Sequence, residues 1–415
     1  MAEPPDKITS LYVHVPFCAQ KCSYCAFYSE AANGEVVNRY VAALICELEL
    51  VAADLRPRTV FFGGGTPSLL NLRQWEQILR ALERLGLLGA QEWTVECNPA
   101  TVSLDKARLL RSFGVNRVSM GVQSLDEALL ERLGRVHNRR MVFKSFDILR
   151  KAGFDNVNLD LMFAIPGQTL ETWQLTLDEA LAIGSEHLSS YEVIYEEDTA
   201  LFAQLRAGEF SVEEELACAM YEELCQRAAA AGFHQYEIAN FARLPALRTC
   251  EHNVNYWRGG CFYGLGPSAT SDVRGTRTRN WPNTQLYCEH LEQGRRAIES
   301  REELAPLARA GETAAFGLRL VEGWPFELFQ QTTGHDLRLD WAADMDQLSR
   351  QGWARMTPER FQLTPEGLRF ADAAAQLFLR PEINPTTAEI HYALNPLHPL
   401  AQRPGAGASD HGHAG

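Results

Sequence analysis

Short apolar runs alternate with segments of helical periodicity over the first two-thirds of the chain, and this alternation restricts the fold more than any other feature. Six runs rich in β-branched and aromatic residues are predicted to be strands, at residues 11–15, 59–62, 93–96, 117–121, 157–162 and 187–194. Helical periodicity fills the intervals, at residues 37–55, 72–86, 104–113, 126–133, 139–152 and 171–183. Repeated strand–helix units indicate an α/β fold with a parallel sheet covered by helices, either an open partial barrel or a doubly wound sheet.

The pattern changes in the last third of the chain. A helix is predicted over 212–231, and a stretch rich in Gly and aromatics over 250–269 is expected to be an irregular functional loop. Residues 300–380 are predicted to form a small helical region with a short hairpin, in which Thr364 caps the last helix and Pro365 begins it. Helices plus a hairpin are typical of a winged-helix-type module.

Charge balance and cysteine content narrow the class of protein. Lys+Arg is 39 against Asp+Glu 53, a net charge of −14, which argues against nucleic acid as a partner because such binding rests on phosphate neutralisation. The chain shows no secretory signal, and no apolar run approaches the ~18–20 residues that span a bilayer. We therefore expect a soluble, cytoplasmic protein with at most peripheral membrane contact. Cysteines in such a reducing compartment are more often metal ligands or reactive thiols than disulfides.

Three of the ten cysteines lie on one short loop. Cys18, Cys22 and Cys25 form a CxxxCxxC motif directly after the first predicted strand. Three thiolates can hold three irons of a cubane cluster, which normally has four cysteine ligands, and an open iron is typical of a catalytic rather than a structural metal site. Zinc is the alternative, but it needs a fourth nearby Cys or His, and the nearest candidate, His14, lies inside the strand.

Further polar or glycine-rich positions fall at or near the ends of the following strands. Gly63–Pro67 reads GGGTP and allows either close approach of a ligand or a tight strand-to-helix turn. Glu96 and Gln123 follow in the next two strands, and Asp160 interrupts an apolar strand, so it needs a partner. Arg135 is a candidate for that partner, for a ligand carboxylate, or for a surface position. Because parallel barrels carry their sites at the carboxyl ends of strands, these positions predict one common site.

The sequence resembles the radical S-adenosylmethionine (SAM) proteins, through CxxxCxxC after the first strand and GGGTP after the second. More narrowly, it resembles the oxygen-independent coproporphyrinogen III oxidase family. The similar segments are HVPFCAQKCSYCAFYS (14–29), FFGGGTPSLL (61–70), VECNP (95–99), RVSMGVQS (117–124), LGRVH (133–137), NLDLMFAIPGQT (158–169) and LTPEGLRFAD (363–372).

The resemblance covers nearly all of residues 10–380 and implies a domain organisation. An N-terminal tail over 1–10 precedes a partial (β/α)6 radical SAM barrel with a heme-site extension over 11–285. A smaller, helical, winged-helix-like domain follows over 286–380. The segment 381–415 is rich in Pro, Ala, Gly and His and is expected to be a disordered tail.

The resemblance also implies cofactors. The three loop cysteines would hold a [4Fe–4S] cluster whose open iron chelates SAM, and one electron would cleave the sulfonium to methionine and a 5′-deoxyadenosyl radical. The positions that are similar to SAM-contacting residues are Tyr12, Tyr24, Gly64, Gly65, Thr66, Glu96, Gln123, Arg135 and Asp160. Among them, the glycine-loop amides would face the SAM amino end, Arg135 its carboxylate, and Gln123 and Asp160 the ribose hydroxyls.

Two features separate this chain from the oxidases of that family. The oxidases carry CxxxCxxCxC and a longer segment before the cluster, whereas Phe27 stands here in place of the fourth cysteine. His252-Asn253-x-x-Tyr256-Trp257 resembles the HNxxYW motif of the HemW-type heme chaperones. One departure from that subgroup is Ala26, where an Asp often follows the third cysteine, and it affects only local polarity.

The resemblance to this subgroup implies a heme chaperone on a radical SAM scaffold, which binds heme and delivers it to respiratory heme proteins. Implied partners are heme, the accepting respiratory proteins, heme-donating ferritin-type proteins and a low-potential electron donor, with a homodimer as the expected assembly. The alternative function is that of an enzyme, oxidative decarboxylation of coproporphyrinogen III to protoporphyrinogen IX by the 5′-deoxyadenosyl radical.

Two roles are open for the HNxxYW residues. His252 would ligate the heme iron while Tyr256 and Trp257 pack on the porphyrin, or His252 and Asn253 would hydrogen-bond inside the loop with the aromatic residues as core. Cys250 and Cys261 flank the stretch and are alternative heme ligands or small buried residues.

Overall fold

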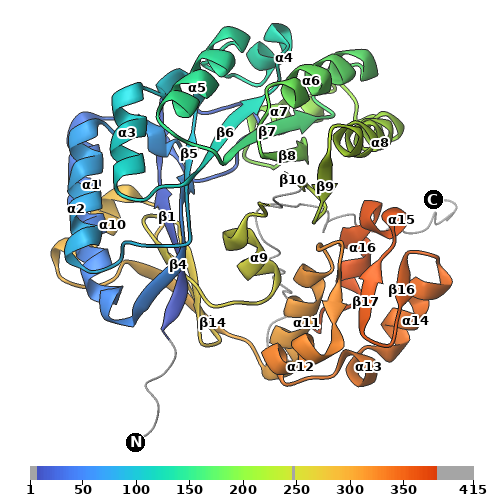
Figure 1. Ribbon diagram of the computed structural model, residues 1–415. Helices are drawn as coiled ribbons and strands as arrows, with labels where there is room; N and C mark the ends of the chain where they lie inside the picture. Colours follow the sequence, from blue (N-terminus) through green and yellow to red (C-terminus); the bar gives the residue numbers. More distant parts are fainter. Residues whose placement is uncertain (1–6, 245–247, 381–415) are drawn as a thin grey trace, which may run out of the picture.

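Residues 7–244 and 248–380 are described by the computed structural model, in which a nine-stranded sheet forms an open barrel (Figure 1). Six parallel strands follow one another in chain order, as predicted: β1 (Ile8–Val15), β4 (Leu55–Gly64), β5 (Glu92–Cys97), β6 (Arg117–Gln123), β7 (Val157–Phe163) and β8 (His187–Glu192). This order is that of a partial (β/α)6 barrel and not of a doubly wound sheet, whose strand order reverses. Because β1 begins at Ile8, the tail expected over 1–10 overlaps a strand.

Strands from later in the chain extend the sheet at both edges. β11 (Tyr263–Leu265) pairs in parallel with β1, while β10 (Asn240–Arg243) pairs antiparallel with β8 and with β9 (Phe233–Gln235). The sequence did not predict these strands, because three or four residues are too few to show a period. The stretch 250–269, expected to be an irregular loop, instead contains helix α9 (Glu251–Trp257) and β11.

Helices cover the outer face of the sheet (Figure 1). The helices in this part of the chain are α1 (Gly34–Val51), α2 (Leu72–Arg84), α3 (Leu104–Ser112), α4 (Glu127–Arg132), α5 (Arg139–Lys151), α6 (Leu170–Ala182), α7 (Ala200–Arg206) and α8 (Glu214–Ala230). Side-chain caps set several of their starts. Asn71 and Gln74 form a capping box at α2, and the Asn138 side chain accepts from a backbone N–H at the start of α5.

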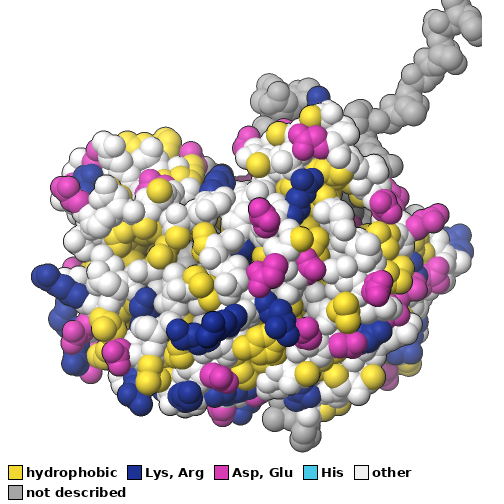
Figure 2. Space-filling view, turned by 90° about the horizontal axis from the view of Figure 1, so that it is seen from above, with side chains coloured by type: hydrophobic (Ala, Val, Ile, Leu, Met, Phe, Trp, Pro, Cys, Tyr) yellow, Lys and Arg dark blue, Asp and Glu magenta, His cyan; other side chains and the backbone are white. Residues whose placement is uncertain are grey.

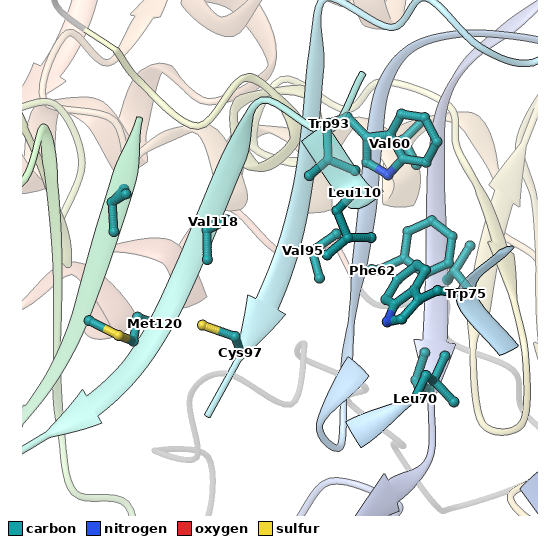
Figure 3. Packing of buried hydrophobic residues seen from close by; sticks show 14 of the residues in the cluster. Val60, Phe62, Leu70, Trp75, Trp93, Val95, Cys97, Leu110, Val118 and Met120 are labelled. Carbon is teal, nitrogen blue, oxygen red and sulfur yellow. The ribbon is translucent and has the colours of Figure 1, made fainter. Parts of the chain in front are cut away.

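The two faces of each strand differ in chemistry. Val118 and Met120 of β6 point outward, beside Val95 and Cys97 of β5, and belong to the main hydrophobic core (Figure 3). Ser119, between them, points inward and donates a hydrogen bond to Asp160 of β7 at 3.1 Å. This period of two places apolar residues under the helices and polar residues inside the barrel. The candidate site residues therefore converge in a polar interior.

A connecting region follows the barrel. It contains the antiparallel strands β12 (Thr270–Val273), β13 (Thr276–Asn280) and β14 (Ile298–Glu303), together with helix α10 (Thr284–Glu292). α10 packs against α1, and its Tyr287 hydroxyl donates to the buried Glu47 carboxylate of α1 at 2.8 Å. The domain boundary expected at 285/286 falls inside α10, whose buried Tyr287, Cys288 and Leu291 belong to the main hydrophobic core.

The C-terminal domain has a hydrophobic core of its own, built from residues between 310 and 378. Its elements are α11 (Pro306–Gly317), β15 (Trp324–Pro325), α12 (Phe326–Thr333), α13 (Leu337–Asp340), α14 (Ala342–Arg350), β16 (Ala354–Met356), β17 (Arg360–Leu363), α15 (Pro365–Arg369) and α16 (Ala371–Gln376). The β16–β17 hairpin and the Thr364 cap agree with the sequence prediction. The tail expected over 381–415 lies outside the described residues.

The surface carries charges of both signs. On the face seen in Figure 2, basic and acidic side chains are interspersed among small apolar patches. Exposed ion pairs such as Arg39–Glu292, at 2.6 Å, are typical of this surface. No helix within the described ranges combines the length and the apolar character that crossing a membrane requires.

Candidate functional site

The cysteine loop starts where β1 ends, at the carboxyl end of the barrel strands. Cys18, Cys22 and Cys25 are partly exposed free thiols on this loop. The short strands β2 (Phe17–Cys18) and β3 (Glu30–Ala31) pair in parallel and bring the two ends of the loop together. The loop therefore presents the three sulfurs from one closed segment beside the barrel opening.

The glycine turn after β4 lies directly against this loop. The Gly65 N–H donates to Val15 O at 2.8 Å, and the Thr66 N–H donates to Phe17 O at 2.7 Å. A Cβ atom on Gly65 would lie 2.7 Å from the same Phe17 oxygen, so only glycine permits this approach. The Thr66 hydroxyl lies 3.7 Å from the Cys18 sulfur. The glycine turn thus packs against one side of the cysteine loop.

Arg135 supplies a buried positive charge on the other side of the loop. Its Nη1 lies 3.4 Å from the Cys22 sulfur and 3.4 Å from the Tyr24 hydroxyl, and its Nη2 donates to Gly121 O at 2.7 Å. Its Nε is buried and has no hydrogen-bond partner in the described part of the chain. A guanidinium with a spare donor suits thiolates or the carboxylate of a ligand.

The chemistry of the three thiols fits a cluster better than a single ion. Burial, together with the neighbouring Cys22 and Cys18, raises the pKa of Cys25 to about 11, so three adjacent thiolates need a cationic partner. Over residues 7–244 and 248–380, no three His, Cys, Asp or Glu side chains converge as one metal ion requires. A cubane binds each thiolate at a separate iron, whereas zinc requires convergence on one point.

Glu96 lies beneath the glycine turn. Its Oε2 accepts from the Gly64 N–H at 3.3 Å, and a Cβ atom on Gly63 would lie 3.0 Å from the carboxyl group. Gly64 itself has a φ of +103°, which favours glycine. Burial raises the pKa of Glu96 to about 8, and the nearby Asp160 adds to this effect. The carboxyl group is therefore placed to accept from an amino or hydroxyl group of a ligand.

Asp160 has its partners on strands β6 and β7. The Ser119 hydroxyl donates to it at 3.1 Å and the Asn158 amide at 2.7 Å, while burial raises its pKa. Arg135, which the sequence suggested as a partner of Asp160, instead bonds to Gly121 and lies beside the cysteine loop. Register explains the correction, because Ser119 pairs with Asn158 and Gly121 with Asp160 across the two strands.

β6 ends in an irregularity that redirects Gln123. The register with β7 shifts between Gly121 and Gln123, and Gln123 has a φ of +64°, which is uncommon for a residue with a side chain. A Cβ atom on Gly121 would lie 3.1 Å from Gln123 Nε2 and 3.3 Å from Arg135 Nη2. Both polar side chains therefore lie over the same glycine. Such backbone strain is concentrated at functional sites.

Tyr12 points into the barrel and is connected to the cysteine loop by His14. The Tyr12 hydroxyl hydrogen-bonds to His14 Nδ1 at 3.0 Å, and His14 Nε2 hydrogen-bonds to Tyr28 O at 2.9 Å. Burial lowers the pKa of His14 to about 4, so the ring is neutral near pH 7. The sequence suggested His14 only as a zinc ligand. The alternation along β1, which places Tyr12 and His14 on one face, is the signal that could have identified it.

The HNxxYW residues lie at the opposite, amino-terminal end of the barrel. His252 Nδ1 hydrogen-bonds to Ser10 Oγ and to Thr59 Oγ1, each at 3.0 Å, and Nε2 hydrogen-bonds to the Tyr256 hydroxyl at 2.7 Å. The side chain is 1% exposed, and burial lowers its pKa to about 3. With both ring nitrogens engaged, this geometry matches the internal hydrogen-bonding role rather than ligation.

The other residues around α9 are buried or partly buried within the chain. Trp257 is buried in a small apolar cluster with Leu320 of the C-terminal domain, and Asn253 is half-buried. Cys250 is buried with its sulfur 3.7 Å from a Glu92 carboxylate oxygen. The Cys261 sulfur accepts from a backbone N–H at 3.4 Å.

A pocket of about 510 Å³ lies beside α9, at the same end of the barrel. Arg58, Asn156, Glu251 and Arg258 line it, and Val254 is the one apolar side chain in its wall. Pockets for flat aromatic ligands are lined mostly by apolar side chains, whereas polar and charged side chains predominate here. The pocket is also remote from the three cysteines.

Comparisons with known proteins place the chain in a family. Residues 12–180 match the radical SAM superfamily, and residues 304–370 match the HemN C-terminal domain. The chain is 32% identical to the heme chaperone HemW of Bacillus subtilis (strain 168) over 376 residues, which cover 89% of this chain and 99% of that protein. It is 34% identical to the heme chaperone HemW of Escherichia coli (strain K12) over 385 residues, which cover 89% and 98% of the two proteins. The chain belongs to the HemW family.

Membership in the HemW family confirms the resemblance that was found in the sequence. The barrel and C-terminal domain also resemble the solved structure of coproporphyrinogen III oxidase (HemN) from Escherichia coli, with a TM-score of 0.78 over 91% of each chain. At 22% identity, this similarity shows the fold alone. The roles of individual side chains in this HemW-family protein stay predictions.

Proposed function

We propose that this chain is a heme chaperone, which binds heme and delivers it to heme-requiring respiratory proteins. One observation carries the proposal: the chain is similar over 89–91% of its length to relatives that are named heme chaperone HemW. The sequence adds support, because Phe27 occupies the place of the fourth cysteine of the related oxidases.

Cys18, Cys22 and Cys25 are the proposed ligands of a [4Fe–4S] cluster. Three observations support this proposal. The cysteines share one loop at the carboxyl end of the barrel, they are partly exposed, and Cys18 and Cys22 help to raise the pKa of Cys25. When bound, such a cluster supplies a one-electron reductant and an open iron for SAM. The chain itself would contribute the wall formed by Thr66 and the positive charge of Arg135, which lie 3.7 Å and 3.4 Å from two of the sulfurs.

The proposed SAM contacts share the rim and the interior of the barrel around this loop. Arg135 would bind the SAM carboxylate through its unpartnered Nε. Glu96 would accept a hydrogen bond from the ligand, although its Oε2 already accepts from Gly64. Gln123 and Asp160 would bind the ribose hydroxyls, and their support is the bulge over Gly121 and the Ser119–Asn158 pair, respectively. Tyr12, Tyr24, Gly64, Gly65 and Thr66 complete the set.

The heme contacts are the least constrained part of the proposal. For His252 to ligate iron, its Nε2 would have to leave the Tyr256 hydroxyl. The geometry therefore favours a heme site whose iron ligand is not His252, with α9 supporting the floor of the barrel. The HNxxYW hypothesis and this one differ in the heme spectrum that they predict for a His252 variant.

A titration of hemin into the full chain with an anaerobically reconstituted cluster tests the chaperone function. We expect the protein to retain heme through gel filtration and to transfer it to an apo-heme protein of the respiratory chain. The same preparation should form no 5′-deoxyadenosine or carbon dioxide in response to coproporphyrinogen III. A protein that fails to retain heme while oxidising coproporphyrinogen III would contradict the proposal and establish the oxidase alternative.

A further inference from the structure

A continuous chain of buried side-chain hydrogen bonds crosses the inside of the barrel. The Asn158 amide nitrogen donates to Asp160 Oδ1 at 2.7 Å. Asn158 Oδ1 lies 2.6 Å from His187 Nδ1, and His187 Nε2 lies 2.8 Å from the Tyr236 hydroxyl. The same hydroxyl accepts from the Cys250 N–H at 3.0 Å. The chain thus runs from the candidate SAM carboxylate to the N-cap residue of α9.

Along this series of hydrogen bonds, every donor points toward Asp160. Asn158 uses its amide nitrogen toward Asp160, so its oxygen is the acceptor toward His187. His187 is fully buried near Arg117, and burial lowers its pKa well below the ordinary value, so the ring is neutral. We therefore assign the proton to Nδ1, which leaves Nε2 to accept from Tyr236. A single tautomer and single rotamers satisfy every link, and such chains polarise cooperatively.

The lower end of this hydrogen-bond chain contacts helix α9 and the C-terminal domain. Cys250 begins α9, and the backbone of Tyr236 accepts from the Val321 N–H of the C-terminal domain at 3.0 Å. Next to it, Glu237 is fully buried, forms a bridge with Leu320 and lies 3.6 Å from Arg319. Tyr236 and Glu237 therefore connect α9 to the C-terminal domain. The Tyr236 hydroxyl is also the last side-chain group of the hydrogen-bond chain.

We infer that Asn158, His187 and Tyr236 are positioning residues that couple occupancy of the SAM site at Asp160 to the position of α9 and the C-terminal domain. The inference rests on the proposed role of Asp160 in SAM binding. A ribose hydroxyl that donates to Asp160 competes with Asn158 for the same carboxylate. The Asn158 amide also donates to Ser119 Oγ at 2.7 Å, so a shift of Asn158 alters both bonds at this end and is passed on to His187 through the directional bond from Nδ1.

The test measures SAM affinity in the full chain with its reconstituted cluster. Tyr236→Phe removes the hydroxyl at the end of the hydrogen-bond series that is far from Asp160, and it leaves the ring packing in place. We expect the SAM dissociation constant to rise about three- to tenfold, as for coupled groups in one network. Tyr221→Phe is the matched control, because its hydroxyl bonds to Ile238 O at 3.1 Å in the same region but outside the chain. It should leave SAM affinity unchanged.

A double-mutant cycle separates coupling from general damage. Asp160→Asn should weaken SAM binding, and Tyr236→Phe should have no further effect in that background. Amide exchange in the first turn of α9 should slow when SAM is added to the wild type and not when it is added to Tyr236→Phe. If Tyr236→Phe does not fold, His187→Leu, which removes both ring nitrogens, should show the same non-additivity.

Two kinds of outcome would overturn the inference, and they are distinguishable. Equal effects of Tyr236→Phe in the wild-type and Asp160→Asn backgrounds, or equal effects of the two Tyr→Phe variants, would show that no coupling exists while SAM binding at Asp160 stands. Unchanged SAM affinity in Asp160→Asn would instead remove the proposed role of Asp160, and the inference with it. Neither outcome depends on heme binding, which is measured separately.

Discussion

The Thr66 hydroxyl lies 3.7 Å from the Cys18 sulfur, and this contact joins the glycine turn after β4 to the cysteine loop after β1. Two backbone hydrogen bonds reinforce it, from Gly65 to Val15 at the end of β1 and from Thr66 to Phe17. The sequence left open whether the glycines admit a ligand or form a tight turn. In the structure, Gly65 serves the packing of two protein segments against each other, which fixes the loop relative to the barrel.

Gly65→Ala should therefore damage the cysteine loop. Its methyl group would lie 2.7 Å from Phe17 O, and relief of this clash requires the loop to move. We expect a loss of about 1–3 kcal/mol in the free energy of unfolding, as for overpacking, and a lower iron content after anaerobic reconstitution. Gly34→Ala is the control, because no atom lies within 4 Å of its added Cβ. Wild-type iron content in Gly65→Ala would show that the contact does not position the loop.

Serine in place of Cys18, Cys22 or Cys25 should abolish cluster binding, because each thiolate is proposed to hold its own iron. The wild type should contain roughly four irons and four sulfides per chain, and air should bleach it because one iron is open to oxidants. Iron and sulfide assays with the visible absorption spectrum measure this. Cys218→Ser, at an exposed thiol, should keep the full cluster. A triple serine variant that retains four irons would show that these cysteines are not the cluster ligands.

Glu96→Gln should change how stability depends on pH in the protein without SAM. The pKa of Glu96 is about 8 in the folded chain against an ordinary 4.5, so between these values the folded state holds a proton that the unfolded state has lost. Stability therefore falls as pH rises through this window, by roughly 3–5 kcal/mol in total. Glutamine cannot titrate, so the advantage of the variant should grow with pH in urea unfolding. Glu83→Gln, at an exposed ion pair, should follow the wild type.

His252→Ala should lower stability and leave the Soret band of bound heme in place. The substitution removes hydrogen-bond partners from Ser10, Thr59 and Tyr256 and leaves a cavity, which costs about 2–4 kcal/mol. His252→Gln, which keeps a hydrogen-bonding group, should lose less. Absorption spectra of the heme-loaded variants and their urea unfolding curves measure the two effects. A displaced Soret band in His252→Ala would identify His252 as the iron ligand after all.

The sequence predicted the parts of the fold that are local and periodic. All six parallel strands and the helices between them were predicted, most of them because they are long enough to show their period. The convergence of Glu96, Gln123 and Asp160 followed from the rule that parallel strands end at one edge. The hairpin after α14 and the Thr364 cap were predicted from turn and cap chemistry.

The remaining features depend on pairing between distant segments. The β6–β7 register gives Asp160 its partner Ser119, and the irregularity that follows it at the end of β6 redirects Gln123; no local pattern reveals either one. Helix α9 is seven residues long and is enclosed by the barrel on one face and by the pocket on the other. A segment so short, with polar residues on both faces, has no detectable period.

The pairing of β1 has a consequence for biosynthesis. β1 carries the cysteine loop, and its neighbour on one side is β4, but its neighbour on the other side is β11, which begins at Tyr263. During translation, the edge of β1 therefore stays uncovered until some two-thirds of the polypeptide has left the ribosome. Iron that reached the nascent chain earlier would find β1 paired on one side only. We therefore expect the cysteine loop to bind iron after β11 has left the ribosome and paired with β1.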